Sequence, residues 1–92
     1  MTLTEQWIIE FGTDFNKKFK HLEKIQQQRI MDFLEDRVLL HKNPRILAKP
    51  LSGSLRGYWR FRVGDYRIIA DIQEEVLTIV ALDLGHRKEV YN

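Results

Sequence analysis

Three arginines crowd onto residues 58–67, a stretch with the pattern of a β-hairpin. Glycine stands first in the two-residue turn at residues 64–65, which is typical of a type II′ loop. Such a turn sets Arg62 opposite Arg67, and strand alternation puts Arg60 on the same face. Like charges directly across a hairpin are destabilising by up to about 1 kcal/mol. The pattern therefore predicts an anion site, the alternative being that both arginines extend into water at little cost.

The other face of this hairpin is apolar and aromatic. It carries Trp59, Phe61, Val63, Tyr66 and Ile68. Aromatic residues on a sheet surface can stack on RNA bases, but this face is the one that helices would cover. We therefore predict that these side chains pack in the core.

Composition limits the function classes that remain. A chain of 92 residues with 43% hydrophobic residues can fold alone as one domain over residues 1–92, without room to enclose a large cofactor. Cysteine is absent, which excludes disulfides, a thiolate metal site and a cysteine nucleophile. There is no membrane-length apolar stretch and no signal-peptide pattern. We expect a cytoplasmic protein with no metal, no cofactor and no membrane partner.

Charge distribution says more than the net charge of +2. Residues 56–67 hold four arginines and a single acid, whereas acids cluster at residues 23–36 and 74–75. A locally basic sheet face suits a polyanionic ligand. Lys49 and Arg56, which flank the loop before the hairpin, extend this surface, so we predict RNA contacts for Lys49, Arg56, Arg60 and Arg62.

The elements that must position these residues follow from hydrophobic periodicity and turn residues. The fold class is α+β in the order β-α-α-β-β-β, with a helical hairpin packed on a small twisted, mainly antiparallel sheet. The last strand has apolar residues on both faces, as a central strand would. The predicted segments are a strand at 7–11, a helix from Thr13 or Asp14 with a stripe of Phe15, Phe19, Leu22 and Ile25, a helix at 26–40, a loop at 44–57, and strands at 58–63, 66–72 and 76–84.

Three segments resemble the RelE/ParE toxin superfamily of type II toxin–antitoxin modules. The run from Gly57 to Ile69 is distinctive of the superfamily, and the ending with His86-Arg87 and Val90-Tyr91 is typical of its RelE branch. The resembling segments are Lys49-Pro50-Leu51, Leu55 to Ile69, and Gly85-His86-Arg87-Lys88-Glu89-Val90-Tyr91.

The resemblance implies a toxin that is a ribosome-dependent mRNA endonuclease, an mRNA interferase. Such enzymes cleave the A-site codon without metal, by attack of a ribose 2′-OH on the adjacent phosphate, and so inhibit translation. By position, the family's catalytic residues fall on Arg60, Arg62, Arg67, Arg87 and Tyr91.

The general base is left open between two residues. The best-known members carry lysines where Arg60 and Arg62 stand, and arginine holds its proton too tightly to act as a base. We therefore assign Arg60, Arg62 and Arg67 to charge stabilisation. Proton transfer falls to His86, because histidine exchanges protons near neutral pH, or to Tyr91.

The resemblance also implies partners and leaves two alternative functions open. The expected partners are a cognate antitoxin, the 70S ribosome with its mRNA, and operator DNA only through the antitoxin complex. One alternative is a ParE-like toxin that inhibits DNA gyrase without cleaving nucleic acid. The other is a non-catalytic RNA-binding remnant of a toxin.

Overall fold

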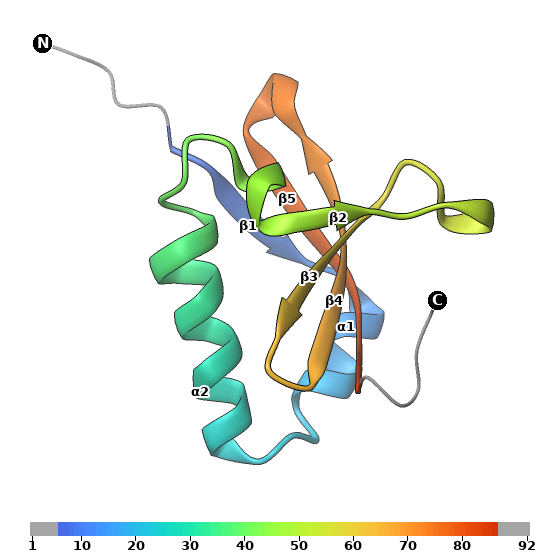
Figure 1. Ribbon diagram of the computed structural model, residues 1–92. Helices are drawn as coiled ribbons and strands as arrows, with labels where there is room; N and C mark the ends of the chain where they lie inside the picture. The colour runs from blue at the N-terminus through green and yellow to red at the C-terminus, as the bar shows by residue number, and fades with distance from the viewer. Residues whose placement is uncertain (1–5, 87–92) are drawn as a thin grey trace, which may run out of the picture.

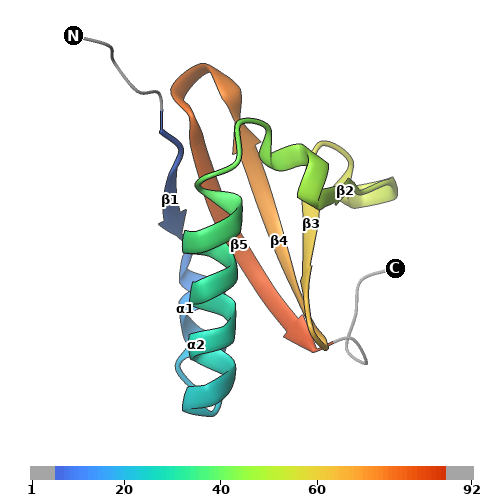
Figure 2. The same cartoon turned by 60° about the vertical axis from the view of Figure 1, so that its left-hand side comes forward.

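Two helices cover one face of a five-stranded mixed sheet in the computed structural model, which describes residues 6–86 (Figures 1 and 2). This confirms the α+β class. The strand order is β1-β5-β4-β3-β2, and only the β1–β5 pairing is parallel among the described strands. The elements are β1 (Ile8–Phe11), α1 (Thr13–Phe19), α2 (Lys24–Phe33), β2 (Ala48–Pro50), β3 (Trp59–Val63), β4 (Tyr66–Gln73) and β5 (Thr78–His86).

The β3–β4 hairpin has the predicted register. Arg62 pairs with Arg67 and Arg60 pairs with Ile69. In the turn, Gly64 has a φ of +58°, a backbone conformation that is unfavourable for any residue with a Cβ atom. Its neighbour Asp65 does not have a positive φ, which agrees with a type II′ loop.

The predicted core face of the hairpin is also confirmed. Phe61 and Ile68 are fully buried, and Val63 is nearly so. Trp59 and Tyr66 are partly buried and pack against the same core. The three arginines therefore point away from the helices, as strand alternation requires.

Strand β5 is internal to the sheet, as its two apolar faces predicted. It pairs in parallel with β1 and antiparallel with β4. The chain passes from β1 straight into α1 at Gly12, where an added Cβ would lie 3.2 Å from the Ala81 carbonyl oxygen. Glycine permits this close approach, so α1 runs beside the part of β5 that extends past β1.

The first helix is shorter than its apolar stripe predicted. It ends at Phe19, because the chain turns there toward α2. The Gln27 amide stabilises this turn by donating hydrogen bonds to the Phe19 and Leu22 carbonyls at 2.9 and 3.2 Å. Leu22 still packs on the core, but Ile25 is 61% exposed and lies outside it.

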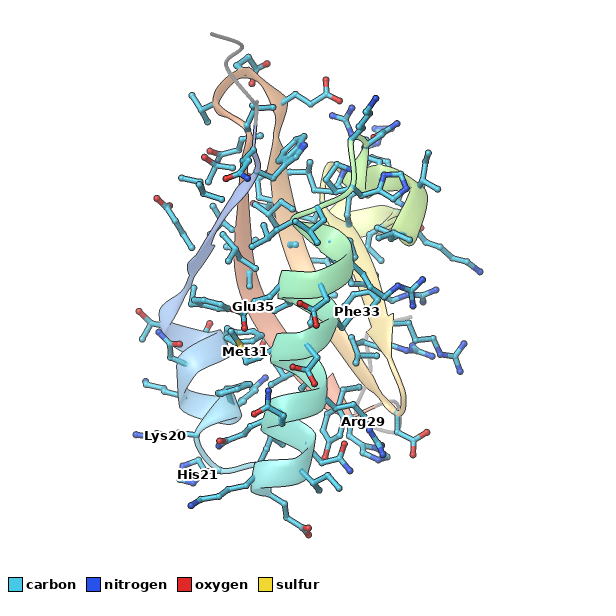
Figure 3. All side chains as sticks on the ribbon, turned by 90° about the vertical axis from the view of Figure 1, so that its left-hand side faces the viewer. Lys20, His21, Arg29, Met31, Phe33 and Glu35 are labelled. Carbon is cyan, nitrogen blue, oxygen red and sulfur yellow. The ribbon has the colours of Figure 1, made fainter. Side chains whose placement is uncertain are left out.

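The second helix continues from α2 into a π-helical turn, Leu34–Val38. The Leu39 amide donates to the Leu34 carbonyl at 2.9 Å, which is the five-residue spacing of a π turn. Ile30, Leu34 and Val38 remain fully buried along one side. Phe33 meets Phe61 edge to face at 6.1 Å between ring centroids, and Figure 3 shows Phe33 on the side of α2 toward β3.

The segment at 44–57, predicted as a loop, contains strand β2, and this part of the prediction is wrong. Lys49 pairs with Arg60 and Pro50 pairs with Trp59 in an antiparallel edge pairing. Three residues are too few to show an alternating pattern, and Pro50 is tolerated only because the strand lies at the edge of the sheet. The strand and the turn that follows it project from the start of β3, away from α2 (Figure 1).

Within residues 6–86, no helix is long and apolar enough to cross a membrane.

Candidate nucleic-acid interface

Four cationic side chains meet on the sheet face that lies away from the helices. Arg62 and Arg67 are paired directly across β3 and β4. Lys49 and Arg60 are paired directly across β2 and β3. Cross-strand partners share one face of a sheet, and Arg60 and Arg62 share it through strand alternation. We call this surface, made of Lys49, Arg60, Arg62 and Arg67, the basic face.

The spacing on the basic face brings charges close together. Directly opposed residues in an antiparallel pair have Cβ atoms about 4.5–5.5 Å apart, so Arg62 and Arg67 can both reach one phosphate group. Within residues 6–86, no carboxylate forms an ion pair with Lys49, Arg60 or Arg62. The positive charge of these three groups is therefore available to an anion.

Like Arg45, Arg60 has a buried donor without an acceptor in the described part of the chain. Its Nε atom is buried and has no hydrogen-bond partner among the described residues. A buried donor without an acceptor is costly, about 1–3 kcal/mol. A phosphate oxygen at Arg60 would remove this cost, because guanidinium groups bind phosphate through parallel N–H donors.

A hollow of about 170 Å³ lies beside these cations. It is lined by Lys49, Arg60 and Arg62 together with Ile46, Leu47 and Ala48. Ile46 is 68% exposed, so it offers an apolar surface next to the charges. The combination of cations and an exposed aliphatic side chain fits a ligand that has both phosphate and non-polar parts.

Arg62 also lines a second hollow, of about 400 Å³, between the hairpin and α2. Asp32 and Asp36 of the second helix line that hollow as well, together with Arg29 and Arg37. The two carboxylates balance the two further arginines in formal charge, so this hollow adds no net positive charge to Arg62.

Arg45 holds the segment that carries Lys49. It belongs to a 3-10 turn, Pro44–Leu47, that leads directly into β2. Its Nη1 forms an ion pair with Glu74, and its guanidinium carbon lies 5.5 Å from the centre of the Trp59 ring. The sequence gives no local signal for this contact, because Glu74 is 29 residues away.

His86 lies on the opposite side of the sheet from the basic face. It pairs with Tyr66 across β4 and β5, and their rings meet edge to face at 5.3 Å. Leu84, two residues earlier on the same face, is buried in the core beneath the helices. On the other face Arg67 is paired with Gly85, which has no side chain. The structure thus groups Arg60, Arg62 and Arg67 but does not bring His86 to them.

The remaining predicted site residues fall outside this cluster. Arg56 is exposed at the end of the 3-10 turn Gly53–Leu55, on the projecting segment. Arg87 and Tyr91 lie outside the described residues. Within the described part of the chain, no group of three or more histidine, aspartate or glutamate side chains is placed to hold a metal ion.

Comparison with known proteins now gives the family. Residues 9–91 match the family described as the ParE toxin of type II toxin-antitoxin system, parDE. The chain belongs to this family and is a toxin of the RelE/ParE type. The resemblance found in the hairpin and in the C-terminal residues is thereby confirmed.

Named relatives agree with this assignment. The chain is 36% identical over 52 residues to Toxin RelG of Mycobacterium tuberculosis, a match that covers 56% of this chain and 60% of that relative. A chain of the crystal structure of the toxin–antitoxin complex RelBE2 from the same organism is 25% identical, with a TM-score of 0.81 and coverage of 91% and 94%. A chain of the RelB–RelE antitoxin–toxin complex of Methanococcus jannaschii is 28% identical, with a TM-score of 0.63 and coverage of 90% and 95%.

Proposed function

We propose that this toxin is a ribosome-dependent mRNA endonuclease that cleaves A-site codons without a metal and so inhibits translation. The observation that carries the proposal is the pairing of Lys49 with Arg60 and of Arg62 with Arg67 on one sheet face. A dense cationic surface of this kind suits the charge that develops on a phosphate during RNA cleavage.

The reaction requires four things. The 2′-oxygen attacks the adjacent phosphorus, a bond forms between them, and the bond from phosphorus to the 5′-oxygen breaks. A base accepts the 2′-proton, and an acid returns a proton to the leaving 5′-oxygen. The extra negative charge on the phosphorane needs cations, and the chain must be held in line for attack.

The residues of the basic face fit the electrostatic part of this reaction. We assign Arg62 and Arg67 to the scissile phosphate, because they oppose each other directly. Arg60 and Lys49 hold the neighbouring phosphate, where the buried Nε of Arg60 would gain its acceptor. Arginine remains protonated throughout, so these groups stabilise charge and do not act as the base.

The base stays open between His86 and Tyr91. His86 lies on the helix side of the sheet, so its participation requires substrate to reach past the end of β5. A pH–rate profile separates the two candidates. If histidine is the base, His86→Ala removes the acidic limb. If tyrosine is the base, His86→Ala keeps that limb and Tyr91→Phe abolishes cleavage.

The family and its solved complexes support an antitoxin partner. RelBE2 and the archaeal RelB–RelE structure are toxin–antitoxin complexes. We propose that a cognate antitoxin neutralises this chain, that the 70S ribosome presents its mRNA substrate, and that operator DNA is bound only through the antitoxin complex. These partners place the protein in the cytoplasm.

The test is primer extension on mRNA incubated with purified toxin, with and without programmed 70S ribosomes. Breaks within the A-site codon should require ribosomes and should fall about 100- to 1,000-fold in rate for Arg62→Ala and for Arg67→Ala, as for other removed transition-state donors. Lys24→Ala, which removes an exposed cation of α2 that lines neither hollow beside the basic face, is the control. Unchanged cleavage in both variants would refute the nuclease assignment.

The matched family description favours a second candidate, a ParE-like inhibitor of DNA gyrase. In that case the basic face binds without cleaving. A supercoiling assay run beside primer extension distinguishes them: intact mRNA with inhibited gyrase supports the ParE function. Intact mRNA with uninhibited gyrase, together with salt-sensitive RNA binding, identifies a non-catalytic RNA-binding remnant.

A further inference from the structure

A hollow of about 640 Å³ opens between the end of α1 and the adjoining ends of β4 and β5. It is larger than the hollows beside the basic face. Among the described residues, His86, one of the two candidate bases, is the one residue assigned to the proposed cleavage that lines it. Its size falls in the range of small-ligand sites, about 300–1,000 Å³. The described residues that line it are Lys17, Lys18, Lys20, His21, Leu22, Tyr66, Leu84, Gly85 and His86.

One wall of the hollow is cationic. Lys17 and Lys20 are exposed, and no described carboxylate forms an ion pair with either. Lys18 differs, because its Nζ lies 2.8 Å from Asp83 Oδ1 and its charge is compensated. Figure 3 shows Lys20 and His21 at the end of α1, where the chain turns toward α2. The wall thus has two positive charges that are free to meet an anion.

The opposite wall is aromatic. Tyr66 and His86 contact each other edge to face, with an interplanar angle of 83°. Leu22 and the buried Leu84 add an apolar floor. Such a surface offers a flat group a place to stack. A simple inorganic anion would use the lysines and leave this aromatic and apolar wall without a contact.

The hollow and the basic face lie on different sides of the sheet. Tyr66 and His86 face the helix side, whereas Arg67, next to Tyr66 on β4, faces the other side. A phosphate bound at the basic face therefore does not occupy the hollow. The two surfaces are separate sites, with β4 and β5 between them.

We propose that this hollow is a nucleotide-binding site, in which the base stacks on Tyr66 and His86 and the phosphate binds Lys17 and Lys20. The occupant must be anionic at one end and flat at the other, which is the chemistry of a nucleotide. The source is either a free nucleotide or a nucleotide unit of an RNA chain. The inference goes beyond cleavage at the basic face and does not depend on it.

Binding is tested with AMP, and with an adenosine tetranucleotide whose 2′-oxygens are methylated so that it cannot be cleaved. Calorimetry gives the affinity, and amide NMR shifts locate the ligand. We expect shifts at Lys20, Tyr66 and His86, and affinity at least 10-fold below wild type for the double variant Lys17→Gln/Lys20→Gln. The matched control is Lys24→Gln/Lys42→Gln, which removes the same charge from residues outside the hollow.

The aromatic wall has its own test. Ribose 5-phosphate, which lacks a base, should bind at least 10-fold more weakly than AMP to the wild type. Tyr66→Leu should reduce that difference, and Tyr66→Phe, which keeps the ring, should preserve it. Thermal unfolding of each variant identifies any that fail to fold, and Tyr66→Phe keeps the comparison informative in that case.

Each outcome decides the proposal. AMP binding at the hollow supports a free nucleotide, and binding of the tetranucleotide alone supports a unit of an RNA chain. Equal affinity for AMP in the Lys17→Gln/Lys20→Gln variant and in the control variant would refute the nucleotide site. This holds even if Lys17→Gln/Lys20→Gln lowers the melting temperature by removing charge from the end of α1. Loss of AMP binding in Arg62→Ala would instead assign the ligand to the basic face. None of these measurements involves ribosomes or cleavage, so their outcome does not depend on whether the protein is a nuclease.

Discussion

Arg62 illustrates how one residue can serve binding at the expense of stability. It is exposed and stands directly opposite Arg67. Threonine at this position would fit an antiparallel strand at least as well and would remove one of two like charges. The cationic pair is therefore explained better by an anionic ligand than by the needs of the fold.

This argument predicts that Arg62→Thr makes the protein more stable. The free energy of unfolding in urea should rise by about 0.5 kcal/mol, within the range for opposed like charges. Arg62→Lys, which keeps the charge, should show no gain. At high salt the difference between Arg62→Thr and wild type should shrink, because screening already weakens the repulsion. A gain that is equal in both variants would mean that charge is not its cause.

At the scale of elements, the β3–β4 turn sets the register that makes the basic face. An added Cβ at Gly64 would meet no atom within 4 Å, so a substitution there is penalised only through its φ of +58°. We predict that Gly64→Ala lowers the free energy of unfolding by about 1–2 kcal/mol. Asp65→Asn, a substitution of similar size at the neighbouring turn position without a positive φ, is the control. Equal losses in the two variants would show that the turn conformation does not matter.

The 3-10 turn that carries Arg45 holds the start of β2. Its contacts with Trp59 and Glu74 are partly exposed, so each is worth little by itself. We predict that Arg45→Ala costs about 1 kcal/mol of stability but speeds hydrogen exchange of the Lys49 amide more than exchange in β5. Arg45→Lys should retain part of the protection. Uniform acceleration across the sheet would indicate global destabilisation rather than local release of β2.

Sequence and structure agree where local patterns decide the outcome. The turn residues and strand alternation were enough to predict that Arg60, Arg62 and Arg67 share a face. Strand β2 was missed because its pairing partner lies ten or so residues away and its own three residues show no periodicity. His86 was grouped with the arginines through the family resemblance and the chemistry of histidine, whereas its face depends on the β4–β5 register, which shifts between Ile69 and Ala70. Long-range register of this kind is set by tertiary pairing and has no local sequence signal.

For the whole molecule, the separation of cations between two sides of the sheet predicts how RNA binding depends on salt. Each phosphate contact to a single strand contributes about −0.7 to the slope of log affinity against log salt concentration. Lys49→Gln, on the basic face, should make the slope of an uncleavable RNA less steep by about 0.7. Lys24→Gln, with the same charge change on α2, should leave it unaltered. Fluorescence anisotropy between about 50 and 200 mM salt measures both, and equal changes in the two variants would show that net charge, rather than the basic face, attracts the RNA.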